Sequence, residues 1–172
     1  MYAGKLVFAQ LTDLIHPEQF HRCVRRYRGD YKVKTFSCWN PFLCMSFGQL
    51  TFRESLRDVE TCLRSRGDQL YHLGIRGDVA RSVLADANRE RDWRIYHDLA
   101  RLLIRRARAL YAKEPIGVEL NQTVYALDST TIDLCLNLFP WARFHRAKAA
   151  IKLDTLLDLR GSIPTFVVSR CW

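Results

Sequence analysis

The spacing at which apolar residues recur changes near Pro115-Ile116-Gly117, and this change limits the folds that the chain can adopt. Before it, apolar side chains recur every three or four residues, as they do along one face of a helix. From Thr123 onward they alternate with polar side chains, as they do along a half-buried strand. A chain of 172 residues is long enough for one large domain or for two small ones. We therefore predict an α+β protein, with an all-α domain at residues 1–117 and a sheet-forming domain at residues 118–172.

Spacing and flanking residues locate the elements within each domain. The predicted helices cover residues 5–15, 17–28, 40–50, 53–66, 79–91 and 92–112, and either Thr51 or Ser55 caps the fourth. The predicted strands cover residues 123–133, 149–158 and 165–169, with a loop at 137–141. Turn residues at 158–162 predict that the last two strands form an antiparallel hairpin.

Positive charge is concentrated in the first domain. The chain carries a formal net charge of +9, with 21 Lys and Arg against 13 Asp and Glu before Val118 and six against five after it. Most of the excess is arginine, whose planar donors suit phosphates and guanine edges, so a nucleic acid is the expected partner. No run is long and apolar enough for a membrane span, and the cysteine spacing fits no zinc site. We expect a cytoplasmic protein with reduced thiols.

Two predicted helices carry the candidate DNA contacts. The helix at 79–91 is rich in small residues, and its Arg81, Asn88 and Arg89 have donors for guanine, adenine and phosphate. The turn before it is longer than in a simple helix-turn-helix, so a helix that only packs against its neighbours is the alternative. The helix at 92–112 carries a basic face. Its members are Arg94, Arg101, Arg105 and Arg108, and the alternative is a solvated face with local partners such as Asp98.

Asp128 lies in the middle of the first strand-like run, YALDSTTIDL. Burying a carboxylate in a central strand is costly without a cation, so the position suggests a metal ligand. The alternative is an edge-strand aspartate bonded to Ser129 or Thr130. Asp154 and Asp158 could approach Asp128 only if the strand register allows it.

Several stretches together resemble the transposases of bacterial insertion sequences, in the DDE family numbered four. In the second domain these are YALDSTTIDL (125–134), LFPWA (138–142), KAAIKL (148–153) and LLDLRG (156–161). In the first they are RESLRDVE (53–60), YHLGI (71–75) and LADAN (84–88). The resemblance extends to about Val168.

The resemblance implies that residues 118–172 form the first three strands of an RNase H-like catalytic domain, with Asp128 as the first of its acidic residues. In that family two aspartates and a glutamate hold Mg²⁺ ions that activate water, and then a 3′-hydroxyl, for attack on DNA phosphodiesters. The implied partner is the DNA of the element's terminal inverted repeats, and the chain could form a homo-oligomer. The family's second aspartate and its glutamate have no counterpart here. We therefore expect a truncated catalytic domain that does not stably bind Mg²⁺ and does not cut DNA by itself.

Three functions remain open from the sequence. The first is a transposase-lineage protein that keeps its DNA-binding region. The second is a stand-alone DNA-binding protein that occupies element ends and competes with an intact transposase. The third is a helical protein whose arginines are only solvated. In each case the incomplete sheet should be less protected than the helical region.

Overall fold

The chain forms two compact units in a computed structural model, which describes residues 6–76, 79–112, 124–134, 143–145 and 148–171. The first unit spans Met1–Ala100 and the second Arg101–Trp172. The first consists of helices and the second contains an antiparallel sheet, so the predicted α+β class is confirmed. The predicted joint at 115–117 and the predicted loop at 137–141 lie outside the described residues.

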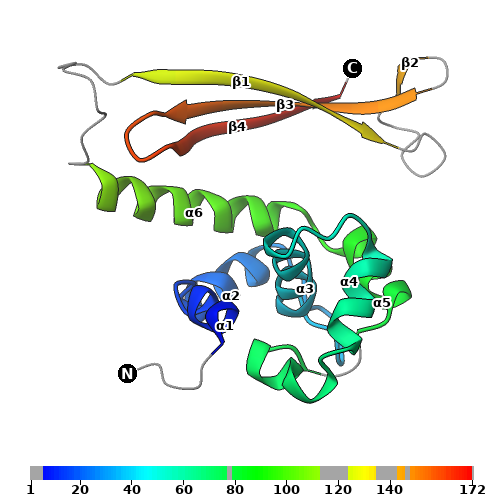
Figure 1. Cartoon of the computed structure of the whole chain (residues 1–172). Helices are drawn as coiled ribbons and strands as arrows, with labels where there is room; N and C mark the ends of the chain where they lie inside the picture. Colours follow the sequence, from blue (N-terminus) through cyan, green and yellow to red (C-terminus); the bar gives the residue numbers. More distant parts are fainter. Residues whose placement is uncertain (1–5, 77–78, 113–123, 135–142, 146–147, 172) are drawn as a thin grey trace. The chain divides into compact units, whose positions relative to one another are not determined.

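Six α-helices and one 3₁₀-helix are present in the described residues (Figure 1). They are α1 (Val7–Thr12), α2 (Pro17–Arg26), α3 (Trp39–Leu50), α4 (Leu56–Arg64), η1 (Gly67–Leu73), α5 (Arg81–Glu90) and α6 (Arg94–Tyr111). The six predicted helices are confirmed, each with small shifts at its ends. Helix α6 contributes its first turns to the first unit and its remainder to the second.

Local chemistry explains where several of these helices begin and end. Pro17 occupies the first turn of α2, where its missing N–H is not needed. The Ser55 side chain accepts a hydrogen bond from the Asp58 N–H and caps α4, which therefore begins three residues later than predicted. Thr51 is instead bound to the preceding helix, because its hydroxyl donates to the Phe47 carbonyl at 2.7 Å. Gly74 ends η1 in the left-handed region at φ 77°, which favours glycine.

We expect Ser55→Ala to lower the free energy of unfolding of the helical unit by about 1 kcal/mol. The substitution removes the acceptor for the Asp58 N–H, which lies 3.2 Å from the Ser55 hydroxyl. Chemical denaturation followed by circular dichroism measures the loss. Ser82→Ala is the matched control, because Ser82 is exposed on a helix and caps nothing. Equal losses in the two variants would contradict the assignment of Ser55 as the cap.

The core of the helical unit lies where α3, α4 and α5 meet. Leu43, Leu63, Ile75 and Leu84 are essentially inaccessible and belong to one apolar cluster. Cys44 is buried with them, and burial raises the pKa of its thiol to about 12. This thiol is therefore protonated at neutral pH and behaves as a small apolar side chain.

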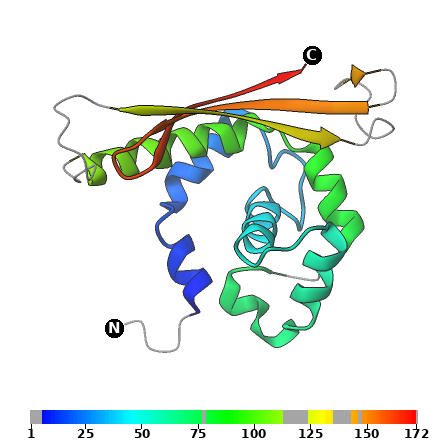
Figure 2. The same ribbon diagram turned by 45° about the horizontal axis from the view of Figure 1, so that its top comes forward.

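The second unit contains a sheet of β1 (Tyr125–Leu134), β2 (Arg143–His145), β3 (Lys148–Asp158) and β4 (Ile163–Cys171). The three predicted strands are confirmed, and the short β2 was not predicted. Strand β3 is central: β1 pairs with one side of it, and β2 and β4 pair with the other (Figure 2). All pairings are antiparallel, so the predicted hairpin of β3 and β4 is confirmed. Within the described residues β1 is an edge strand.

Candidate nucleic-acid interface

Helix α5 packs against the rest of the helical unit through one narrow face. Leu84 and Ala87, three residues apart, are 0% and 4% exposed and pack in the cluster that includes Val59 and Leu63 of α4. The other side chains of α5 are exposed, and they are mostly small or polar. The helix is therefore packed against its neighbours and also presents a polar face to solvent, so the two sequence-based alternatives for it are compatible.

The polar face of α5 carries the three residues that sequence analysis singled out. The Arg81 backbone N–H donates to Glu60 Oε1 at 3.1 Å, which fixes the start of α5 on α4. Within the described residues no hydrogen bond or ion pair involves the Arg81 guanidinium, and the side chain is exposed. Arg89 pairs with Asp86 at 2.8 Å on the same helix, so its charge is partly neutralised. Among the described residues, the Asn88 Nδ2 donates one long hydrogen bond, to Met45 Sδ at 3.7 Å.

The connection between α4 and α5 differs from a simple helix-turn-helix. It contains η1 and the left-handed Gly74, so it is far longer than a turn of three or four residues. The buried side chains of Leu70, Leu73 and Ile75 anchor it in the same cluster as α4 and α5. The position of α5 relative to α4 is therefore fixed by packing in the apolar cluster, and not by a short turn between the two helices.

The predicted basic face of α6 divides into bound and unbound arginines. Arg94, in the first unit, bonds to Asp92 at 3.1 Å and its guanidinium lies 5.5 Å from the ring centroid of Tyr27. Asp98, the proposed local partner, instead accepts from Arg26 and from the Tyr27 hydroxyl, so it does not neutralise the α6 arginines. In the second unit, Arg108 lies 3.7 Å from Asp158.

Arg101 and Arg105 are the α6 arginines that are exposed and without a partner in the part of the chain that the structure describes. They are four residues apart and therefore lie on one side of the helix. Two guanidinium groups at this spacing repel each other, and an anion such as a phosphate would relieve the repulsion.

Asp128 is exposed on the edge strand β1 and accepts a hydrogen bond from Thr130 Oγ1 at 2.9 Å. Because the Asp128 carboxylate is exposed and lies on an edge strand, it carries no cost of burial that a cation would have to offset. The local bond to Thr130 is the one that the alternative interpretation named. A role for Asp128 as a metal ligand stays a prediction.

The strand register separates Asp128 from the two aspartates of β3. Asp128 lies opposite Thr155, whereas Asp154 lies opposite Ser129 and Asp158 opposite Tyr125. Because opposed residues in antiparallel strands share a face, Asp154 and Asp158 lie on the other face of the sheet from Asp128. The Ser129 hydroxyl donates to Asp154 at 2.8 Å on that face. Among the described side chains, no group of three His, Cys, Asp or Glu could hold a metal ion.

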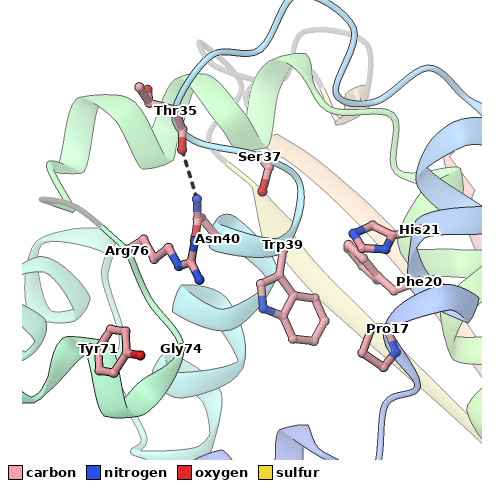
Figure 3. Close-up of a pocket in the computed structure, with 10 residues that line it drawn as sticks. All are labelled: Pro17, Phe20, His21, Thr35, Ser37, Trp39, Asn40, Tyr71, Gly74 and Arg76. Carbon is pink, nitrogen blue, oxygen red and sulfur yellow. Dashed lines mark hydrogen bonds between the residues drawn. The ribbon is translucent and has the colours of Figure 1, made fainter.

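A pocket in the helical unit was not indicated by any sequence pattern. It has a volume of about 580 Å³ and is lined by residues of α2, the segment before α3, the start of α3, η1 and the segment after η1 (Figure 3). Its lining includes Phe20, Trp39 and Tyr71, together with His21 and Arg76. These residues are far apart in the sequence, so periodicity could not bring them together.

The first unit is thus a small helical unit with an exposed polar helix, and the second contains an antiparallel sheet and most of α6. Residues 3–76 match the model of a family described as a domain of unknown function, DUF4372, a domain found in transposase-like proteins. The match covers α1 to η1 and ends before α5. Neither a curated protein nor a solved structure matches the chain. None of the described helices combines the length and apolar character needed to cross a membrane.

Proposed function

We propose that the chain is a DNA-binding protein of the transposase lineage, in which α5 contacts the DNA. The observation that carries the proposal is the attachment of α5 through Leu84 and Ala87, with Arg81 and Asn88 on the solvent side. Small residues allow a helix backbone to enter the major groove, and arginine and asparagine read guanine and adenine there. Arg101 and Arg105 are proposed phosphate contacts. The match of residues 3–76 to a domain found in transposase-like proteins supports the same lineage.

The proposed DNA target is the terminal inverted repeat of an insertion sequence. In a complete DDE transposase, Mg²⁺-dependent cleavage and strand transfer would act at these repeats, and Asp128 would supply one ligand. Such a site needs several carboxylates from different elements, so further ligands would have to come from outside the described residues. We therefore propose DNA binding, and not cleavage, for the part of the chain that the structure describes.

A stand-alone role at element ends is the second candidate. The specific observation in its favour is that the helical unit has its own buried core, so DNA binding does not depend on a catalytic site. A protein of this kind would occupy the repeats and compete with an intact transposase, alone or as a homo-oligomer. We place the chain in the cytoplasm, in keeping with the free Cys23, Cys38, Cys44 and Cys62.

Binding of the full chain to duplex DNA tests the proposal. The probes are a labelled duplex from the inverted repeats that bound the element and a duplex of the same composition in scrambled order, read by fluorescence anisotropy. If Arg101 and Arg105 each neutralise one phosphate, the logarithm of the binding constant should fall with the logarithm of salt concentration with a slope of about −1.8. The repeat should bind about a thousandfold more tightly than the scrambled duplex.

Two results would count against this function. A slope near zero would mean that no phosphates are neutralised. Equal affinity for the two duplexes would remove sequence-specific binding, and with it the assignment of α5 as the helix that reads bases.

A further inference from the structure

We propose that the pocket lined by Trp39 and Arg76 binds a nucleotide, with the base against its aromatic wall and the phosphate at Arg76. This inference goes beyond the proposed function, because the pocket contains neither α5 nor the α6 arginines. The same chemistry could come from a free deoxynucleoside monophosphate or from an unpaired nucleotide of DNA. In Figure 3 the rings of Trp39, Phe20 and Pro17 lie on one side of the pocket, and the Arg76 and Tyr71 side chains lie on the other.

The aromatic wall is held in place by further rings. Phe20 meets Trp39 edge to face, with ring centroids 4.9 Å apart, and Phe42 stacks on Trp39 at 5.3 Å. Phe42 in turn stacks on Tyr96 at 6.3 Å. Trp39 therefore cannot swing away freely, although it is only half-buried. A nucleobase stacked on an aromatic side chain of this kind gains about 1–3 kcal/mol.

The charge of the pocket favours an anion. Arg76 and His21 are its basic lining residues, and no Asp or Glu is among the described residues that line it. The exposed Arg76 guanidinium makes no hydrogen bond or ion pair with any described residue. A guanidinium without a described partner, across the pocket from an aromatic wall, suits a phosphate attached to a flat ring.

Polar groups supply the remaining recognition chemistry. Asn40 is 6% exposed, and its Nδ2 donates to the Thr35 carbonyl at 3.3 Å, which fixes the orientation of the amide. Ser37 and Thr35 are two further polar residues that line the pocket. A purely apolar ligand would leave these groups and Arg76 unused, and a simple anion would leave the aromatic wall unused. The volume of about 580 Å³ lies in the range of small-molecule sites.

Titration of the full chain with the four deoxynucleoside monophosphates tests the proposal. Isothermal calorimetry gives the affinity, and quenching of tryptophan fluorescence reports stacking on Trp39. We expect Arg76→Gln to weaken binding about tenfold, because a charge-assisted hydrogen bond is lost. We expect Trp39→Phe to reduce the quenching. Arg57→Gln is the matched control, because Arg57 is exposed on α4 and does not line the pocket.

Inorganic phosphate and the uncharged deoxynucleosides test the two parts of the site separately, the phosphate contact at Arg76 and the aromatic wall at Trp39. Each should bind more weakly than the monophosphate. If inorganic phosphate binds as tightly as a nucleotide, or if Arg76→Gln binds nucleotides like the unmodified chain, the proposal is overturned. Absence of any nucleotide binding overturns it as well.

DNA probes identify the source of the nucleotide. If a duplex with one unpaired nucleotide binds more tightly than the fully paired duplex, and Arg76→Gln removes the difference, the pocket takes a nucleotide of DNA. If mononucleotides bind but the two duplexes are equivalent, it takes a free nucleotide. Arg81→Gln should leave mononucleotide binding unchanged. If the unmodified chain binds mononucleotides but not the duplex, only the proposed function is contradicted.

Discussion

Leu84→Ala is expected to lower the free energy of unfolding of the helical unit by about 2–5 kcal/mol. Leu84 is fully buried and packs between α5 and the cluster that contains Leu43 and Leu63. Truncation to alanine removes apolar contacts and leaves a cavity that the neighbouring helices cannot fill without shifting. Denaturant unfolding followed by circular dichroism measures the loss.

Val83→Ala is the control for this substitution. Val83 is the preceding residue of the same helix, but it is 40% exposed, and alanine is the better helix former. We expect a change of no more than about 0.5 kcal/mol. If the two variants lose the same stability, α5 is not attached through Leu84 and the basis of the proposed interface fails.

Arg81→Gln is expected to weaken binding to the cognate duplex by about 1–3 kcal/mol, which is roughly ten- to a hundredfold. The Arg81 guanidinium makes no interaction with described residues, so binding DNA breaks no existing bond. Its backbone bond to Glu60 is kept in the variant, and the start of α5 should stay in place. Anisotropy with the repeat and the scrambled duplex measures the effect, which should be larger for the repeat.

Two further variants sharpen the result. Arg105→Gln should weaken both duplexes alike and make the salt slope less steep by about 0.9, as expected for a phosphate contact. Arg22→Gln makes the same charge change at an exposed position of α2 and should have a much smaller effect. Equal losses in all three variants would show that only net charge matters and that α5 does not read bases.

The helices could be predicted because their buried residues repeat at helical spacing, as Leu84 and Ala87 do on α5. The strands β1 and β3 could be predicted because apolar and polar residues alternate in their sequences, and the two strands pair in an antiparallel ladder. The start of α4 was less predictable, because both Thr51 and Ser55 can cap a helix. Ser55 is the cap because the Thr51 hydroxyl is already bound to the carbonyl of Phe47 in the preceding helix α3.

The site was harder to predict, because it depends on long-range pairing. Exposure of Arg81 on α5 follows from the helical pattern. The ion pair of Arg108 with Asp158 joins residues from a helix and a strand, and no local pattern signals it. The register that places Asp128 opposite Thr155 is likewise set by the whole ladder and not by the sequence around Asp128. The pocket at Trp39 requires α2, α3 and the segment after η1 to be packed first.

Because β1 is an edge strand of the described sheet, a further strand can pair with it. In an antiparallel ladder, alternate residues of an edge strand point their backbone N–H and C=O groups away from the neighbouring strand. About half of these groups in β1 can therefore form hydrogen bonds with an added strand. Leu127, in the same strand, is 75% exposed and offers such a strand an apolar contact. Extension of the sheet in this direction, by a segment of longer polypeptide or by another molecule, would require no rearrangement of β3 or β4.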